Sequence, residues 1–280
     1  MTHAINQVNA FTADGQNGNP AGVVLDADEL SEEQMLAIAA QAGFSETAFV
    51  SASNKATYKV RFFTPTEEVD LCGHATIATW SFMYQRHLIT AGDYTQETLA
   101  GILGVSVADD GLIFMEQAKA EFYDEISASS VAPLLGITED ELHPKLKPQI
   151  VSTGLRDLLV PLKNDSVLSR LRPDFEQMTD FSKQHKITGL HVFSLKNSPD
   201  SIADARNFAP AVGIPEECAT GTSNGALLCY LKQHGVLPDQ PIYRIEQGKA
   251  MDKLSHIYGK FVDDRVCVGG LAAFVGDFMA

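Results

Sequence analysis

Residues 61–87 read RFFTPTEEVDLCGHATIATWSFMYQRH, and residues 206–234 read RNFAPAVGIPEECATGTSNGALLCYLKQH. Each stretch joins an Arg-x-Phe-x-Pro motif to a cysteine that opens an apolar run. The two copies stand 145 residues apart at the proline and 146 apart at the cysteine. This agreement in order and spacing favours a duplicated structural unit over coincidence.

Each copy predicts a strand, an acidic turn marked by proline, and a helix. The helical runs, residues 73–85 and 219–231, contain no charged residue on any face, whereas a surface helix carries a polar stripe. Both helices are therefore predicted to be buried on all sides. Because such a helix needs enclosing walls, we expect an α+β fold of two pseudo-symmetric domains, each a curled mixed or antiparallel sheet or barrel around a central buried helix.

The repeat predicts an N-terminal half over residues 1–118 and a C-terminal half over residues 119–267, with residues 268–280 packing back on the first half. Residues 43–50 and 189–195 extend the correspondence at a spacing of 146, and both are predicted strands. A weaker correspondence joins residues 19–25 to residues 153–160.

Two further segments have their own signals. Residues 31–43 predict an amphipathic helix outside the first sheet, with a serine N-cap, an acidic first turn and a glycine stop. Residues 116–148 contain short polar helical patterns, and we interpret them as a linker and the entry to the second half.

Composition limits the classes of partner. The 280 residues are 45% hydrophobic, enough for two ordinary cores. The formal net charge of −15 opposes attraction to phosphate backbones, so nucleic acid is not expected as a partner. No segment reaches the roughly 18 apolar residues of a membrane span, and the start of the chain does not resemble a signal peptide. We therefore expect a cytoplasmic protein that has no membrane partner.

The four cysteines show no CxxC spacing and no adjacent cluster of histidines, which argues against zinc and against a disulfide scaffold. The glycine-rich residues 15–22 fit neither a P-loop nor a dinucleotide fingerprint, because Pro20 interrupts them. No Ser-His-Asp elbow and no HExxH motif is present. Metal, nucleotide and acyl-serine chemistry therefore lack their usual signatures.

Two buried helices that each begin in a turn rich in glycine and threonine favour a cleft between the halves that holds a small anionic substrate, because helix N-termini attract carboxylates. The candidates for substrate binding comprise two glycines that allow close approach and three hydroxyl donors: Gly73, Gly221, Thr220, Thr222 and Ser223. Ordinary capping of the helices by these residues is the alternative.

Glu46 lies in the strand-like run FSETAFV, where apolar neighbours would disfavour its charged form and suit it to proton transfer. An exposed glutamate at the start of a strand is the alternative. His74 lies in the first turn of a buried helix, where the positive helix end should keep its imidazole neutral. A purely structural histidine is the alternative there.

Cys72 and Cys218 precede the two helix starts, a setting that favours thiolates. Two facing thiols would exchange protons with opposite faces of one carbon. The alternative is that both are small buried residues, which is our interpretation of Cys229 and Cys267.

The chain resembles the PhzF-like phenazine-biosynthesis family, which shares the fold of diaminopimelate epimerase. The resemblance rests on VNAFTADGQNGNPAGVVLDAD, GFSETAFV, RFFTPTEEVDLCGHATIATW and RNFAPAVGIPEECATGTSNGALLCYL. It implies two pseudo-symmetric halves with the site between them, no cofactor and a homodimer. It also implies roles for individual residues. Glu46 matches the family's acid/base glutamate, His74 its histidine, Glu217 an aspartate and Thr222 a serine, and Asn19 is a further candidate for substrate binding.

The run Glu216-Glu217-Cys218-Ala219-Thr220-Gly221-Thr222 departs from the family's usual E-D-P-A-T-G-S. Three hypotheses follow. The first is a cofactor-independent isomerase that moves a proton on a small carboxylate-bearing substrate, with Glu46 as acid/base and with His74, Glu217 and the helix ends positioning the anion. The second is an amino-acid epimerase or racemase, or a related dehydratase, that uses Cys72 and Cys218. The third is a protein that binds a small ligand without catalysis.

Overall fold

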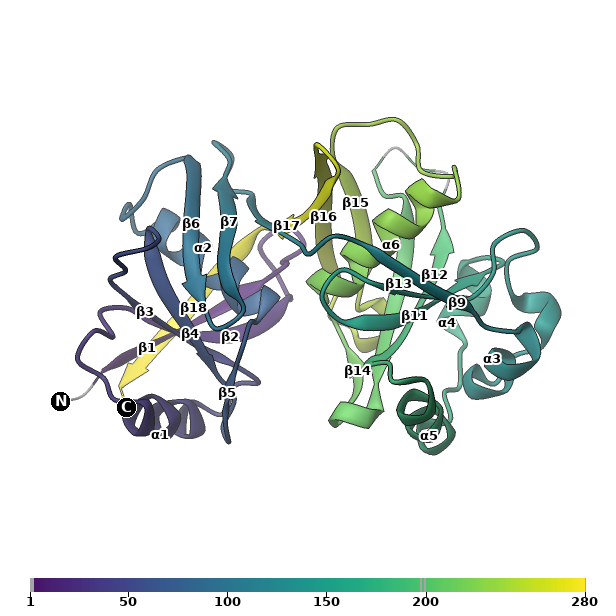
Figure 1. The fold of residues 1–280 in the computed structure, drawn as a ribbon, viewed down its shortest axis with the longest axis horizontal. Coiled ribbons are helices and arrows are strands. Elements are labelled where there is room, and N and C mark those ends of the chain that lie inside the picture. The colour runs from purple at the N-terminus through teal and green to yellow at the C-terminus, as the bar shows by residue number, and fades with distance from the viewer. Residues whose placement is uncertain (1–2, 197, 199, 280) are drawn as a thin grey trace. The chain divides into compact units, whose positions relative to one another are not determined.

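The computed structural model describes residues 3–196, 198 and 200–279 (Figure 1). The chain forms two compact units. Unit 1 comprises Met1–Glu116 and Gly269–Ala280, and unit 2 comprises Gln117–Val268. These limits lie within two residues of the boundaries that the repeat predicts.

Unit 1 contains a mixed sheet with the strand order β18-β1-β2-β3-β4-β6-β7-β8. The β2–β3 and β4–β6 pairs are parallel, and the short strand β5 pairs with β4. Its strands are β1 (Ala4–Ala10), β2 (Asn19–Val24), β3 (Thr47–Ser51), β4 (Tyr58–Phe63), β5 (Glu68–Val69), β6 (Gly92–Thr98), β7 (Gly101–Val107), β8 (Ile113–Glu116) and β18 (Ala272–Met279).

Unit 2 repeats this arrangement with the order β9-β10-β11-β12-β13-β15-β16-β17, in which β14 takes the place of β5. Its two parallel pairs, β11–β12 and β13–β15, occupy the corresponding positions. Its strands are β9 (Glu121–Glu125), β10 (Gln149–Ser152), β11 (Arg156–Leu162), β12 (Gly189–Leu195), β13 (Ala203–Ala209), β14 (Ile214–Glu217), β15 (Tyr243–Gln247), β16 (Ser255–Val262) and β17 (Arg265–Gly270). The prediction of two pseudo-symmetric α+β domains is confirmed.

The strand register corrects one predicted correspondence. Thr47 pairs with Phe63 in unit 1, and Leu190 pairs with Phe208 in unit 2. Since Phe63 and Phe208 are equivalent in the Arg-x-Phe motif, β3 and β12 stand 143 residues apart, and the predicted spacing of 146 is wrong there. Glu46 therefore corresponds to Gly189, where a Cβ would collide with the carbonyl oxygen of Phe208.

One buried helix lies within each unit, α2 (Gly73–Gln85) in unit 1 and α6 (Gly221–Gln233) in unit 2. Every residue of α2 from His74 to Met83 is buried, and so is every residue of α6 from Ser223 to Leu231. Helix α6 starts two residues later than the apolar run suggests. The prediction that both helices are buried is confirmed.

Shorter helices pack against the outer core of each unit. Helix α1 (Glu32–Ala42) has the predicted Ser31 cap and a left-handed Gly43 stop, and it packs on β3 and β4. The remaining helices belong to unit 2: α3 (Ala128–Leu135), α4 (Asp165–Ser169), α5 (Phe175–His185) and the 3-10 turns η1 (Glu139–Glu141), η2 (Pro210–Val212) and η3 (Lys249–Met251). The interpretation of residues 116–148 as a linker is wrong in part, because β9 and α3 there belong to the sheet and core of unit 2.

The Arg-x-Phe motif has a structural role in both units. Arg61 donates two hydrogen bonds to Glu68 in β5, at 2.6 and 2.5 Å, and its guanidinium lies 5.1 Å from the Phe63 ring. Arg206 makes the same pair of bonds to Glu216 in β14, both at 2.8 Å, and lies 5.0 Å from the equivalent phenylalanine. The segment expected to be an acidic turn is therefore a short strand that the arginine attaches to the sheet.

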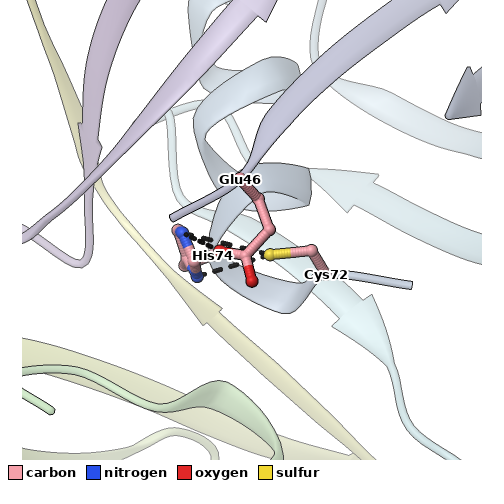
Figure 2. Close-up of side chains that lie close together, drawn as sticks. All are labelled: Glu46, Cys72 and His74. Carbon is pink, nitrogen blue, oxygen red and sulfur yellow. Dashed lines mark hydrogen bonds and ion pairs between the residues drawn. The ribbon is translucent and has the colours of Figure 1, made fainter. Parts of the chain in front are cut away.

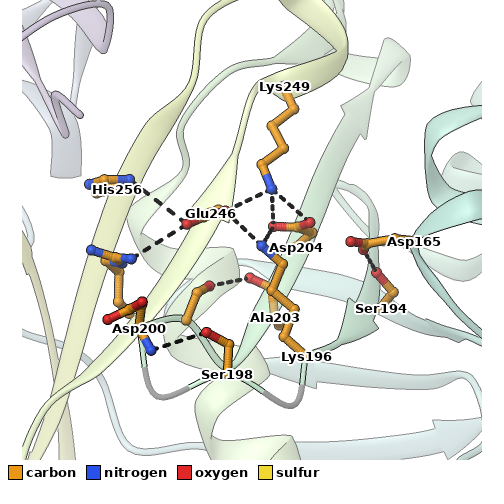
Figure 3. A network of polar contacts seen from close by, with 12 residues as sticks. Asp165, Ser194, Lys196, Ser198, Asp200, Ala203, Asp204, Glu246, Lys249 and His256 are labelled. Atoms are coloured by element: carbon orange, nitrogen blue, oxygen red, sulfur yellow. Dashed lines mark hydrogen bonds and ion pairs between the residues drawn. The ribbon is translucent and has the colours of Figure 1, made fainter. Parts of the chain in front are cut away.

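A network of charged side chains joins β13 and β15 in unit 2 (Figure 3). Asp204 and Glu246 are paired residues on these parallel strands, so their carboxylates lie side by side. Lys196 and Lys249 each contact both carboxylates at 2.7–2.8 Å. The two lysines offset the repulsion between the carboxylates, and the network attaches the end of β12 to the sheet.

Among the described residues, no helix is both long enough and apolar enough to cross a membrane.

Candidate active site

Three side chains of unit 1 converge at the start of α2 (Figure 2). Glu46 Oε2 lies 3.3 Å from His74 Nε2. Cys72 Sγ lies 3.4 Å from His74 Nδ1 and 3.9 Å from Nε2. The sequence predicted each of these residues as catalytic, and the structure brings all three together around the imidazole.

Local structure explains this convergence. The Gly43 stop ends α1, and the chain then runs directly into β3, where the carbonyl of Glu46 accepts a hydrogen bond from the Gly22 amide at 3.1 Å. Cys72 is the extended N-cap residue of α2, and His74 is the second residue of that helix. Strand entry and helix start are therefore both fixed by backbone hydrogen bonds, which hold the three side chains in place.

The histidine is buried, whereas the glutamate is accessible. The side chain of His74 is 9% exposed and that of Glu46 is 21% exposed. Burial lowers the pKa of His74 below its usual value, and the nearby Glu46 charge opposes this effect to a smaller extent. The imidazole is therefore neutral at physiological pH. The sequence predicted a neutral imidazole from the helix dipole, but burial is the main cause.

The two buried helices begin differently from the others. Helices α1, α3, α4 and α5 start with a capping side chain, supplied by Ser31, Ser127, Asn164 and Asp174. Neither Cys72 of α2 nor Thr220 of α6 makes a side-chain capping bond. Ordinary capping, the alternative stated for Thr220, is therefore not what the structure shows at the start of α6. The first backbone amides of α2 and α6 can bind an anion instead.

The residues at the start of α6 that were predicted to bind substrate differ in whether their side chains already make hydrogen bonds within unit 2. The Ser223 hydroxyl donates to Asp157 at 2.6 Å and accepts from Asn207 at 3.1 Å, so its bonds are already made inside unit 2. Thr220 donates its hydroxyl to Gln247 at 3.0 Å. Gly221 and Thr222 are half-buried at the helix start, and their positions suit them better to ligand contact than that of Ser223.

The start of α6 rests on a buried polar network that the sequence analysis missed. His191 lies 3.1 Å from Asn224 and 3.2 Å from Asn207. Burial raises the pKa of Asp157 to about 6 and lowers that of His191 to about 4. Asp157 and His191 come from β11 and β12, far from α6 in sequence, and only the strand register would have revealed their proximity.

Cys218 has a different environment from the one expected of a catalytic thiolate. It is buried, and burial raises the pKa of its thiol, with a smaller contribution from the charge of Glu217. The expectation that the helix start favours the thiolate is wrong at this position, because loss of solvent outweighs the helix dipole. Glu217 itself is half-buried at the end of β14.

Two further features of unit 1 concern the predicted site. Ser45 Oγ lies 3.4 Å from His74 Nε2, a contact that the sequence analysis did not predict although Ser45 adjoins Glu46. Asn19 is the first residue of β2 and is buried, and it pairs with Ala10 in the sheet. Gly73 is half-buried, and a Cβ there would contact only the Met115 side chain, at 3.7 Å. There is therefore room for a methyl group beside Gly73.

The chain resembles known proteins along its whole length. The family model "Phenazine biosynthesis-like protein" (PhzC-PhzF) matches residues 8–277. The uncharacterized isomerase YddE of Escherichia coli K12 is 36% identical over 264 residues, which cover 90% of this chain and 88% of that protein. The crystal structure of a Bacillus anthracis phenazine biosynthesis protein of the PhzF family superposes with a TM-score of 0.90 at 31% identity, covering 100% of this chain and 99% of that one.

A hydroxyproline epimerase of Agrobacterium vitis shares the fold, with a TM-score of 0.62 over 100% of this chain and 91% of that one. At 9% identity this likeness concerns the fold alone. The family match and the relatives named as isomerases confirm the predicted family and the predicted class of enzyme. The chain belongs to the phenazine biosynthesis-like (PhzC-PhzF) protein family and is an enzyme of the isomerase type.

Proposed function

We propose that this enzyme is a cofactor-independent isomerase that moves a proton between carbon atoms of a small carboxylate-bearing substrate, with Glu46 as the acid/base. The observation that carries the proposal is the position of Glu46. Its Oε2 atom is buried, and among the described residues it accepts no hydrogen bond of normal geometry, although His74 Nε2 lies 3.3 Å away. A carboxylate oxygen held in this way is a ready proton acceptor.

The proposed reaction conserves atoms and charge. Glu46 removes a proton from a carbon next to a conjugated or carboxylate group, and the electron pair of the C–H bond moves into that group. The resulting anion lies at the uncapped start of α2, where backbone amides stabilise it. Glu46 then returns the proton to a different carbon of the conjugated system.

His74 has a supporting role in this proposal. Because its imidazole is neutral, it donates one hydrogen bond without adding a positive charge beside Glu46. When the Cys72 thiol donates to Nδ1, the ring proton resides on Nε2, which faces Glu46. Cys72 is then a positioning residue that selects the tautomer of His74.

The proposed contacts for the substrate are Glu217, Thr220, Gly221, Thr222 and Asn19. The alternative in which Cys72 and Cys218 act as paired bases is less favoured, because burial disfavours the Cys218 thiolate. A homodimer and a cytoplasmic location stay predictions.

The experiment that tests the proposal is a screen of small unsaturated and 2-substituted carboxylic acids for uptake of deuterium from D₂O, followed by NMR. We expect the wild-type enzyme to label at least one acid and the Glu46→Gln variant to label it about 10²–10⁴-fold more slowly. Glu33→Gln, on the exposed face of α1, is the matched control and should retain the wild-type rate. An acid that stabilises the enzyme against heat without any exchange would support the third hypothesis, binding without catalysis.

A further inference from the structure

We propose that Glu46, Cys72 and His74 form a binding site for Zn²⁺ or another soft divalent cation, which competes with the carbon-acid substrate. The three residues offer a carboxylate oxygen, a sulfur and an imidazole nitrogen, and these atoms lie within 4.8 Å of one another (Figure 2). They are three of the ligand types that zinc prefers. Cys72-Gly73-His74 contains neither a CxxC spacing nor a cluster of histidines, so it lacks the usual zinc signatures in the sequence.

The two donor distances that involve His74 are close to those of a tetrahedral ion. Zinc bonds of the usual length place sulfur, nitrogen and oxygen donors about 3.4–3.6 Å apart around the metal. His74 Nε2 lies 3.3 Å from Glu46 Oε2 and 3.9 Å from Cys72 Sγ. These two distances are within a few tenths of an ångström of coordination geometry, whereas the oxygen–sulfur distance, at most 4.8 Å, would shorten by up to about 1.3 Å through rotation of the Glu46 and Cys72 side chains.

The state of the ligand atoms also favours a cation. Glu46 Oε2 is buried without a hydrogen bond among the described residues, and a metal ion would satisfy it. His74 Nε2, 3.3 Å from Glu46 Oε2, offers a lone pair to the ion in the tautomer whose ring proton resides on Nδ1. The positive end of α2 opposes a cation, but a carboxylate and a thiolate together supply two negative charges that offset it.

The Glu46 side chain is 21% exposed, so an ion can reach its carboxylate from solvent. Three protein ligands leave the fourth zinc position to water or to another small ligand. Zinc binding deprotonates Cys72 and releases its proton, so the affinity should rise with pH.

The consequence for activity rests on the proposed function. A bound ion would occupy the lone pairs of Glu46 and His74, and it would thereby block the proton transfer assigned to Glu46. Zinc would therefore be an inhibitor that competes with the substrate.

Cobalt(II) substitutes for zinc and reports thiolate ligation through a charge-transfer band in the near ultraviolet, so a Co²⁺ titration of the metal-free full chain is the direct test. We expect a saturable spectrum at one ion per chain, displaced by Zn²⁺. Cys72→Ser should abolish the charge-transfer band. His74→Gln and Glu46→Gln should weaken binding by more than about 100-fold, exceeding the usual effect of residues outside the coordination shell.

Cys267→Ser is the matched control, because Cys267 is also a buried thiol but lies in β17. It should bind cobalt like the wild type. A second variant, Cys72→Ala, and thermal unfolding of each protein separate lost ligation from lost folding. An unchanged charge-transfer band in folded Cys72→Ser, or no stoichiometric band in the wild type, would overturn the metal site.

The experiments can reject the metal site and the isomerase mechanism independently of each other. Cobalt binding without deuterium exchange in any acid would leave the metal site standing and reject the isomerase mechanism. Deuterium exchange that Zn²⁺ does not inhibit, in an enzyme that binds no cobalt, would reject the metal site and leave the isomerase mechanism in place.

Discussion

Glu46 Oε2 and His74 Nε2 lie 3.3 Å apart, although the first residue leads into β3 and the second lies in the first turn of α2. The duplicated fold does not duplicate this pair. The register of β12 places Gly189 where unit 1 has Glu46, and a side chain there would collide with the sheet. Unit 2 therefore has a glycine at the position of the proposed acid/base of unit 1, and its helix start is held by a hydrogen-bonded network.

Gly73→Ala tests whether substrate approaches the start of α2. The added Cβ contacts only Met115, at an ordinary distance of 3.7 Å, so the fold should keep its melting temperature. The methyl group would narrow the space at the first residue of α2, where the substrate carboxylate is proposed to bind, and we expect kcat/KM for exchange to fall about tenfold or more, equivalent to about 1.4 kcal/mol. Gly276→Ala, at an open position in β18, is the control. Equal activity in both variants would show that the substrate does not approach Gly73.

Asp157→Asn tests the buried network of unit 2 through its pH dependence. Burial raises the pKa of Asp157 from 3.8 to about 6 in the folded state, so the folded protein holds this proton more tightly than the unfolded chain does. The resulting stabilisation is full below the unfolded pKa, decreases as pH rises, and is lost above about pH 6.

Relative to Asp157→Asn, the wild type should therefore lose about 2 kcal/mol of unfolding free energy between pH 4.5 and pH 7. Urea denaturation at both pH values measures this difference, and groups that titrate equally in the two proteins cancel. A constant difference between the proteins would mean that Asp157 is ionised throughout this range.

Arg206→Lys tests the arginine that attaches β14 to the sheet. Lysine cannot make the paired bonds to Glu216 or stack on Phe208 in the same way, so we expect a loss of about 1–3 kcal/mol in unfolding free energy. Lys147→Gln is the control, since it removes an exposed ion pair with Glu125 and should cost less than about 1 kcal/mol. An equal loss of unfolding free energy in the two variants would contradict the structural role assigned to the Arg-x-Phe motif.

The sequence predicted those features that depend on local chemistry. Runs without charge marked α2 and α6 as buried helices, and the Ser31 and Gly43 signals marked both ends of α1. The repeated motifs predicted the duplicated fold, because the same strand, turn and helix occur in the same order. Glu46, Cys72 and His74 were each singled out by their neighbours in the chain.

The sequence did not predict the features that depend on strand register. The run around Glu46 contains no landmark shared with unit 2, so its alignment was displaced by three residues. Asp157 and His191 are single polar residues in apolar strands, and their contacts with Ser223, Asn207 and Asn224 arise only when the sheet curls around α6. The sequence also predicted a favoured thiolate at Cys218, because the depth of burial that opposes it was not visible.

The most direct test of the account compares deuterium exchange on one substrate by Glu46→Gln and by Cys218→Ala, each shown to fold by thermal unfolding. With Glu46 as the acid/base and Cys218 as a buried thiol, the first variant should lose about 10²–10⁴-fold of the exchange rate, and the second should stay within about threefold of the wild type. Exchange that survives in Glu46→Gln and is abolished in Cys218→Ala would contradict the account and favour the paired-thiol mechanism.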